Sequence, residues 1–266
     1  MADDEGYLLD NRQEEAGRRF DALAALFDPA TFRRLDAIGL APGWHVWEAG
    51  AGGPSVPTWL SHRVGPAGRV LATDIDISRL HAVPGVEVLR HDVGEEPAPD
   101  GPFDLVHARL LLVHVPNRDR ALAEMVAALK PGGRLVVEEA DPALQPLVCL
   151  EDRGPAEERA NRLKSGFRRL MAERGVDLAY GRTLPRRLRE LGLVDVGADA
   201  SFPITGAACA ELERATVEQI RDRLLAGGIA TAEEVDAHLA AVAGGALDLA
   251  TSPMITAWGR RPVLRG

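Results

Sequence analysis

A short glycine-rich segment places the strongest constraint on how this chain can fold. Residues 46–57 read Val-Trp-Glu-Ala-Gly-Ala-Gly-Gly-Pro-Ser-Val-Pro, which predicts a buried strand that breaks into a tight turn and continues as a helix. Glycine at positions 50, 52 and 53 removes side chains that would keep a ligand away from the backbone, and it tolerates the positive φ that such a turn needs. Because the first N–H groups of the following helix have no partner within that helix, the segment is suited to a nucleotide-like ligand.

Strands and helices alternate along the chain after this turn. Parallel neighbours in a sheet need crossover connections of about the length of the intervening segments. The sequence therefore predicts an α/β fold, a doubly wound and mostly parallel sheet of seven strands with a Rossmann-like arrangement. The predicted strands are residues 44–47, 69–74, 86–92, 103–108, 134–138, 194–196 and 254–258.

Helices are predicted on both sides of this strand pattern. Apolar residues at helical spacing over residues 7–38 predict two N-terminal helices that are separated at Asp28-Pro29, because proline ends one helix and can start another. A short helix is expected around residues 78–82. One further predicted helix takes in residues 58–60 and stops near Val64, and the others cover residues 122–129, 156–174, 184–191, 208–226 and 231–243.

The helices near the end of the chain carry no recognisable motif. We expect residues 142–180 and 206–250 to pack as a helical lid over the C-terminal edge of the sheet. Open α/β sheets bind ligands at that edge. The lid would then decide the choice of substrate.

Composition excludes several classes of protein. The chain has 266 residues, of which 46% are hydrophobic, so it can bury one large core and is neither disordered nor fibrous. A net charge of −9 argues against non-specific binding of nucleic acid. The acidic residues 1–6 do not resemble a secretory signal, and no segment has about 20 apolar residues in a row, so we expect a cytoplasmic protein without a membrane partner. Cys149 and Cys209 form neither a disulfide framework nor a zinc cluster.

Three acids stand where successive predicted strands stop. Glu48, Asp74 and Asp92 follow the first three strands, and the ends of parallel strands meet at one edge of a sheet. Asp74 lies 24 positions after Gly50, close to the spacing of about 20 expected for an acid that binds a ribose. The pattern indicates a nucleoside ligand. NAD fits poorly because Ser55 stands where the dinucleotide fingerprint has its third glycine.

Several motifs together resemble a known family. Residues 48–53, Glu-Ala-Gly-Ala-Gly-Gly, are similar to the E/D-x-G-x-G first motif of class I S-adenosylmethionine-dependent methyltransferases, and Pro54 departs from the further glycine that many members have. The resemblance covers about residues 40–140, and the N-terminal helices look like those of bacterial small-molecule or natural-product methyltransferases. The further matching segments are 70–76 (second motif), 90–93 (adenine-binding turn), and 103–106, 111–116 and 129–135 (fourth-strand and fifth-strand signatures).

The resemblance implies a division of the chain into three parts. Residues 1–39 would be N-terminal helices that cover the cofactor, and residues 40–141 would be the core that binds S-adenosylmethionine. Residues 142–266 would complete the sheet and supply the lid insertions. S-adenosylhomocysteine would be the product.

The resemblance also assigns roles at the cofactor site. Asp74 would accept both ribose hydroxyls, because a carboxylate offers two acceptor oxygens. Ile75 would pack against the adenine, and Asp92 would accept from its exocyclic amine. The alternative is that both acids only cap the helices that follow them. The residues expected to contact the cofactor are Tyr7, Arg19, Glu48, Gly50, Ala51, Gly52, Asp74, Ile75, Asp92, Val93, Ala108 and Arg109.

The methionine part of the cofactor would lie along the glycine turn. Residues 50–52 would pass close under it and the ribose, with Glu48 anchoring the turn or facing the methionine amino group. Ala108 and Arg109 would lie near the same end. Tyr7 and Arg19 would close over the cofactor, and the alternative for both is an ordinary position on a helix surface.

Three residues are candidate catalytic groups. Methyl transfer from a sulfonium depends mainly on alignment and desolvation, and a hydroxyl acceptor would also need a base. His114, after the fourth strand, is the first candidate, since histidine titrates near neutral pH, and the alternative is a histidine that only holds its loop. Glu139 and Asp141, just past the fifth strand, are the second. His107 is expected to be packed within its strand, and no residues have metal-ligand spacing.

The sequence predicts a small, hydrophobic acceptor of natural-product type, methylated on O, C or N, and a monomer or homodimer. Two other functions stay open at this point. A protein of this fold can hold the cofactor and catalyse cyclisation or another reaction without methylating, and a sensor can bind the cofactor without catalysis. A nicotinamide dehydrogenase is a third alternative.

Overall fold

The computed structural model describes residues 14–80 and 83–263. These residues form two compact units. We call the first the sheet unit; it comprises the described residues within Asp28–Ala140, Tyr180–Ser201 and from Met254 onward. The second, the helical unit, comprises the described residues up to Phe27 together with Asp141–Ala179 and Phe202–Pro253.

The sheet unit contains a seven-stranded sheet with the strand order β3-β2-β1-β4-β5-β7-β6. All neighbours are parallel except β7, which runs antiparallel to both β5 and β6. The predicted fold class, a mostly parallel seven-stranded sheet, is confirmed. The strands are β1 (His45–Ala49), β2 (Arg69–Asp74), β3 (Glu87–Arg90), β4 (Phe103–Arg109), β5 (Leu129–Ala140), β6 (Val194–Ser201) and β7 (Met254–Arg260).

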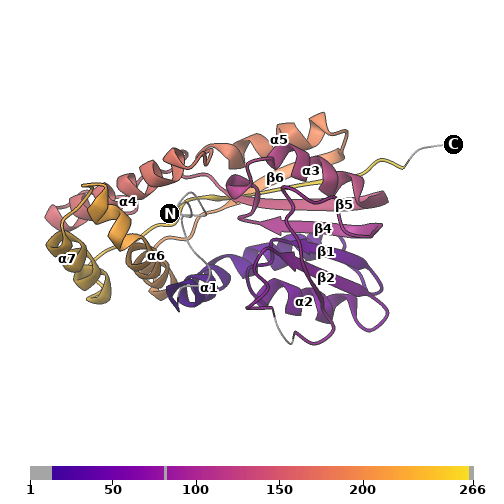
Figure 1. Ribbon diagram of the computed structural model, residues 1–266, viewed down its shortest axis with the longest axis horizontal. Helices are drawn as coiled ribbons and strands as arrows, with labels where there is room; N and C mark the ends of the chain where they lie inside the picture. Colours follow the sequence, from indigo (N-terminus) through magenta and orange to yellow (C-terminus); the bar gives the residue numbers. More distant parts are fainter. Residues whose placement is uncertain (1–13, 81–82, 264–266) are drawn as a thin grey trace. The chain divides into compact units, whose positions relative to one another are not determined.

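The central strands are buried on both faces, which explains why they read as almost continuous apolar runs. Trp47 on β1, Leu105 on β4 and Val136 on β5 are all fully buried. Figure 1 shows β1, β2, β4 and β5 side by side, with α2 beside β1 and β2. The helices of this unit are α2 (Ser55–Val64), the short 3-10 helix η1 (Leu112–His114), α3 (Arg118–Ala127) and α5 (Tyr180–Glu190).

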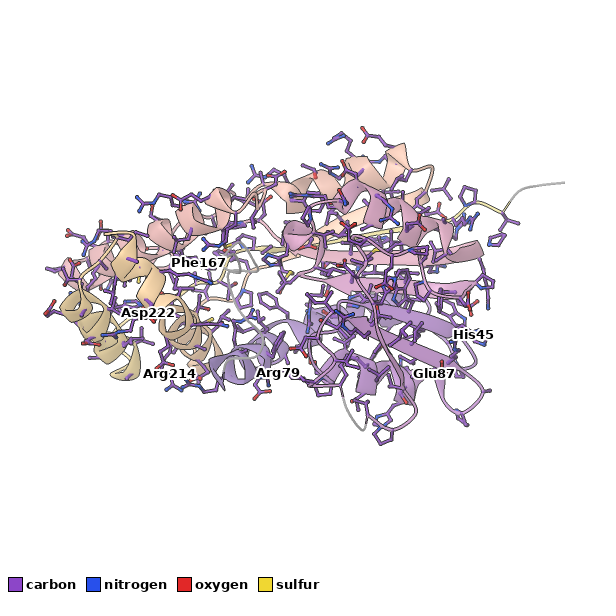
Figure 2. All side chains as sticks on the ribbon, viewed as in Figure 1. His45, Arg79, Glu87, Phe167, Arg214 and Asp222 are labelled. Atoms are coloured by element: carbon purple, nitrogen blue, oxygen red, sulfur yellow. The ribbon has the colours of Figure 1, made fainter. Side chains whose placement is uncertain are left out.

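The helical unit packs three helices around a core of its own. They are α4 (Pro155–Glu173), α6 (Ala207–Ala226) and α7 (Ala232–Ala243), close to the predicted ranges. Leu163, Leu170, Ile220 and Leu224 lie in this core, and Phe167, labelled in Figure 2, packs against it from α4. The domain boundaries and the place of these helices as a lid stay predictions.

Two expectations about helices are wrong. The N-terminal segment contains one continuous helix, α1 (Glu14–Ala37), and Pro29 lies inside it. An internal proline costs a helix about 3 kcal/mol, but packing can outweigh that cost, and Phe27 and Leu35 on either side are buried. Around Ser78 the chain forms a turn, because Asp76 accepts the backbone N–H of Ser78 and competes with helix formation. Residues 81–82 lie outside the described residues.

No helix in the described ranges is long and apolar enough to cross a membrane.

Candidate functional site

The glycine turn after β1 needs residues without side chains. Gly50 and Gly52 have φ values of +65° and +61°, which L-residues with a side chain rarely adopt. A Cβ atom added to Gly50 would lie 2.6 Å from Cδ1 of Leu111. The backbone N–H of Ala51 donates to the carbonyl of Thr73 at 3.0 Å, which ties the turn to the end of β2. The turn therefore has a fixed path, and Leu111 occupies the space that a side chain at position 50 would need.

Asp74, the last residue of β2, joins this turn to the loop that follows its own strand. Its Oδ2 accepts the N–H of Gly52 at 2.9 Å, and its Oδ1 accepts the N–H of Asp76 at 3.0 Å. Burial raises the pKa of Asp74, and the hydrogen bonds from Asp76 and Gly52 act in the opposite direction. Ile75 beside it is a large apolar side chain with 56% of its surface exposed.

Asp92 organises the turn after β3. Its Oδ1 accepts the N–H of Gly94 at 2.9 Å, and its carbonyl accepts the N–H groups of Glu95 and Glu96. Val93, between Asp92 and Gly94, is buried. One carboxylate oxygen of Asp92 thus shapes a turn, with no helix in the described residues before β4 for this acid to cap, and the other oxygen is not needed for that hydrogen bond.

The strand order brings these residues to one edge of the sheet. β3, β2, β1 and β4 are neighbours, so the residues at and after their C-terminal ends follow one another along that edge. The opposite edge is marked by His45 and Glu87, which begin β1 and β3, and Figure 2 shows them at one end of the sheet with Arg79, from the loop after β2, at the other. The glycine turn, Asp74 and the Asp92 turn form the candidate site.

The carboxylate of Glu48 is buried and contacts a histidine on the neighbouring strand β4. Its Oε2 lies 2.6 Å from Nδ1 of His107 on β4, and both side chains are buried. The other ring nitrogen of His107 lies 3.5 Å from Oε2 of Glu138 on β5. His107 is packed in its strand as predicted, and it also links two carboxylates.

The remaining predicted cofactor residues differ in their surroundings. Ala108 is fully buried in β4, and Arg109 donates to Oδ1 of Asp28 at 2.8 Å and to Oγ1 of Thr31 at 3.1 Å. Arg19 on α1 belongs to the helical unit and is only 5% exposed, with its guanidinium 4.9 Å from the centre of the Phe20 ring. Tyr7 lies outside the described residues.

Glu139, near the end of β5, has the most unusual environment of the candidate catalytic groups. It is fully buried, and its Oε1 accepts the N–H groups of Leu111 and Leu112 at 3.1 and 2.6 Å. In the described part of the chain, its Oε2 has no hydrogen-bond partner. Burial raises the pKa of Glu139 to about 8, against the effect of the backbone donors of Leu112, Leu111 and Val113.

His114 and Asp141, the other candidates, have different positions. His114 is half-buried at the end of η1, where its backbone N–H donates to the carbonyl of Leu111 at 3.0 Å. Asp141 belongs to the helical unit, and its Oδ1 accepts the N–H of Leu144 at 2.9 Å. The sheet unit therefore brings together Glu139 and the loop that carries His114.

Sequence reasoning missed three features of the site. Leu111 fills the space over Gly50, and Tyr180 at the start of α5 is buried between Arg118 and Arg187, whose guanidinium carbons lie 5.6 and 4.8 Å from the ring centre. The contact of His107 with Glu48 has a signal in the sequence, because the two residues stand at matching positions of strands that pair in the sheet. Among residues 14–80 and 83–263, no group of three or more His, Cys, Asp or Glu side chains could hold a metal ion.

Comparison with known proteins agrees with this geometry. A family model described as a methyltransferase domain matches residues 47–137. The ubiquinone/menaquinone biosynthesis C-methyltransferase UbiE of Vibrio cholerae serotype O1 is 34% identical over 129 residues, which are 44% of this chain and 50% of the relative. The same enzyme of Hahella chejuensis is 30% identical over 160 residues, 52% of this chain and 64% of the relative. The chain thus spans about half to two thirds of the length of these curated relatives.

Solved structures show the same fold at low sequence identity. Phosphoethanolamine N-methyltransferase 2 of Haemonchus contortus has a TM-score of 0.59 and 16% identity, and the match covers 98% of this chain and 61% of that chain. A putative methyltransferase from Bacillus halodurans has a TM-score of 0.55 and 16% identity, with 86% and 98% covered. Residues 47–137 therefore match the methyltransferase domain family, and the fold that contains them is the fold of these solved methyltransferases.

Proposed function

We propose that the protein binds S-adenosylmethionine at the C-terminal ends of β1, β2 and β3 and transfers its methyl group to a small molecule. The observation that carries this proposal is the carboxylate of Asp74, held under the glycine turn by the N–H of Gly52 at 2.9 Å. Its oxygens accept the N–H groups of Gly52 and Asp76, and a carboxylate, with about four acceptor sites, can also accept from ribose hydroxyls.

The residues around Asp74 fit a nucleoside with a flexible amino-acid tail. Ile75 offers an exposed apolar surface on which a flat adenine can pack, since aromatic rings gain most from apolar contact. The second carboxylate oxygen of Asp92 and the N–H of Val93 are the groups that would recognise the adenine edge. Gly52 and Gly53 present backbone without side chains, which suits close approach of the ribose and the methionine part.

The other positions keep their expected roles within this proposal. Glu48 anchors the turn, and the methionine end of the cofactor lies towards Ala108 and Arg109. Arg109 is also bound by Asp28 and Thr31, so a contact with the cofactor would add to that ion pair. Tyr7 and Arg19 remain candidates for covering the cofactor.

The cofactor supplies an electrophilic methyl group, and the protein supplies alignment and exclusion of water. For an acceptor that must lose a proton, we infer that Glu139 is the base. A buried carboxyl oxygen without a hydrogen-bond partner among the described residues, in a group with a pKa of about 8, suits proton transfer near neutral pH. His114, the first candidate from the sequence, and Asp141 stay alternatives for this role.

We propose a small, hydrophobic acceptor for this reaction. The relatives from Vibrio cholerae and Hahella chejuensis are named as C-methyltransferases of ubiquinone and menaquinone biosynthesis, which supports carbon as one of the possible target atoms. The apolar side chains of the helical unit support a hydrophobic acceptor less than the sequence suggested, because Leu163, Leu170 and Ile220 pack with one another in the core of that unit.

The oligomeric state is a separate proposal, a monomer or a homodimer. A series of protein concentrations in analytical ultracentrifugation would decide between the two.

Calorimetric titration with S-adenosylmethionine tests the binding step. Asp74→Ala should weaken binding at least 100-fold, because it removes a charged acceptor and the anchor of Gly52. Glu87→Gln is the matched control: it changes an acid of the neighbouring strand β3 at the opposite edge of the sheet, where Glu87 pairs with Arg69. Unchanged affinity in Asp74→Ala, or binding of NAD in place of S-adenosylmethionine, would contradict the proposal.

The transfer step needs a separate measurement. Incubation with panels of phenols, quinols and amines should release S-adenosylhomocysteine together with a product heavier by one methylene unit, detected by mass spectrometry. A protein that binds the cofactor and converts such a substrate without releasing S-adenosylhomocysteine would instead belong to the non-methylating enzymes of this fold.

A further inference from the structure

His107 occupies a position in the sheet that packing alone does not explain. The ring is fully buried on β4, with Nδ1 2.6 Å from Oε2 of Glu48 on β1 and Nε2 3.5 Å from Oε2 of Glu138 on β5. Three ionisable side chains therefore meet in the interior of three adjacent strands. Burying such a group costs desolvation that apolar side chains would avoid, so stability is a poor explanation for its presence.

Glu138 is held from three further directions. Its Oε1 accepts the hydroxyl of Thr256 on β7 at 2.7 Å, and its Oε2 accepts the hydroxyl of Thr31 on α1. The charge of Arg109 on β4 also acts on it. Because these contacts fix Glu138, it is a rigid support for the far side of the His107 ring.

The charges decide what the ring can do. Burial by itself would lower the pKa of His107, but the charge of Glu48, its hydrogen bond with Nδ1 and the nearby carboxylate of Glu138 raise it to about 9. The ring is then an imidazolium at neutral pH, and an imidazolium donates from both nitrogens. It can bind Glu48 and Glu138 at the same time, which a neutral ring cannot do.

The contact between Glu48 and His107 lies close, along both strands, to residues of the candidate site. Glu48 stands two residues before Gly50, where the glycine turn begins. His107 stands four residues before Leu111, whose side chain lies against Gly50. A link between Glu48 and His107 therefore joins the start of the turn to the start of the loop that packs on it.

We propose that His107 is a positioning residue for the cofactor site: held between Glu48 and Glu138, its ring locks the ends of β1 and β4 so that the glycine turn and Leu111 keep the shape that S-adenosylmethionine needs. This inference rests on the proposed function. It assigns no contact between His107 and the cofactor, and its effect is transmitted through Glu48 and through the β4 loop.

Nuclear magnetic resonance of protein labelled in histidine tests the geometry without any ligand. Of the seven histidines, His107 should titrate with a midpoint near pH 9, and Glu138→Gln should lower that midpoint towards 6.5. His107→Asn assigns the resonance, and His62→Asn, at an exposed position of α2, is the control that leaves it unchanged. A midpoint at or below 6.5 in the wild type would overturn the proposal even if His107→Asn fails to fold.

Binding of S-adenosylhomocysteine tests the functional step. His107→Asn keeps a donor towards Glu48 but neither charge nor reach to Glu138, and it should bind at least tenfold more weakly at pH 7.5. The affinity of the wild type should also fall between pH 8 and 10, as His107 loses its proton. The affinity of His107→Asn should fall less over the same range. Titration of Glu139 and of the ligand's amino group is common to both proteins, so the difference between the two curves belongs to His107.

The two proposals fail in different ways. If the wild type binds neither S-adenosylmethionine nor S-adenosylhomocysteine, the proposed function is wrong. If the wild type binds and folded His107→Asn matches it in affinity and in pH dependence, the cofactor site is retained and the positioning role of His107 is wrong.

Discussion

Each unit of the molecule buries one histidine beside a glutamate, and the two pairs have opposite surroundings. In the sheet unit, His107 lies between the carboxylates of Glu48 and Glu138. In the helical unit, Nε2 of His238 on α7 lies 3.0 Å from Oε1 of Glu213 on α6, and no second carboxylate is paired with this ring among the described residues. Burial would raise the pKa of Glu213, but His238 and the charge of Lys164 on α4 hold it below its usual value.

The difference between the pairs indicates their functions. The sheet unit has two carboxylates for one imidazolium, and the group lies where two strands end beside the glycine turn. The helical unit has two basic side chains for one carboxylate, contributed by three helices that otherwise pack through apolar residues. We infer that the first group shapes a ligand site and that the second joins helices. Variants of matched residues in the two units can break or sharpen this distinction.

The largest expected effect compares two buried glutamates. Glu139→Gln should lower kcat about 100- to 1000-fold for an acceptor that loses a proton, while the affinity for S-adenosylmethionine changes less than about threefold, because the amide cannot take a proton. Glu213→Gln should lower the melting temperature without lowering kcat of the folded protein. Steady-state kinetics and calorimetry on both variants measure these quantities.

The pH profile sharpens the same prediction. Since Glu139 must be ionised to act as a base, wild-type kcat should rise as pH passes through about 8. Equal turnover in Glu139→Gln and wild type would remove Glu139 as the base. If His114→Ala instead lost 100-fold while Glu139→Gln did not, the role would pass to His114.

The next effect compares the two histidines through the free energy of unfolding. The pKa of His107 is about 9 in the folded protein against 6.5 ordinarily, so between these values the folded state keeps a proton that the unfolded state has lost. Its stabilisation is complete below pH 6.5 and is lost as pH rises to 9, by at most about 3 kcal/mol. Urea unfolding at pH 6, 7.5 and 9 should show this decrease in wild type and in His238→Asn, but a smaller one in His107→Asn.

Glu139 adds a slope of its own in this range. Its pKa is raised from 4.5 to about 8, so between these values the folded state keeps a proton that the unfolded state has lost. The free energy of unfolding therefore also falls as pH rises through this range. That contribution is shared by all three proteins and cancels in the comparison. A decrease of the same size in His107→Asn and wild type would show that His107 is not the titrating group.

Much of the sheet unit was predictable because its signals are local. Each strand is an apolar run, and the glycine turn with Asp74 follows a spacing that depends only on neighbouring elements. The contact between Glu48 and His107 joins residues 59 positions apart and depends on strand register. Aligning the ends of the predicted strands would have suggested it, but burial and the second carboxylate come from the folded sheet.

The helical unit was predictable only as a set of helices. The ranges of α4, α6 and α7 follow from apolar periodicity, whereas the Glu213–His238 pair depends on which helix faces meet. The predicted break at Asp28-Pro29 failed for the same reason: local propensity favours a break, and packing on both sides of the proline decides otherwise.

A smaller effect is expected from adding one methyl group in each unit. Gly50→Ala must hold a side chain at φ +65° against Leu111, and it should weaken cofactor binding about tenfold with little change in helical content. Gly166→Ala on α4 would place a Cβ atom 2.2 Å from Cγ2 of Ile229, and overpacking of this kind costs about 1–3 kcal/mol. Calorimetry and thermal unfolding of both variants should therefore give opposite patterns. Normal binding by Gly50→Ala would show that the turn tolerates a side chain.

The smallest effect concerns the start of α7 and belongs to the helical unit alone. The hydroxyl of Thr231 accepts the N–H of Glu234 at 3.3 Å, while the Glu234 carboxylate accepts the N–H of Thr231 at 3.0 Å. Thr231→Ala removes one half of this capping box and should destabilise the protein by about 1 kcal/mol, whereas Thr231→Ser keeps the hydroxyl and should be close to wild type. Cofactor affinity should be the same in all three proteins. If Thr231→Ala weakened binding of S-adenosylmethionine as well, the packed helices α4, α6 and α7 would contribute to the cofactor site, and the separation of roles drawn from the two histidines would be wrong.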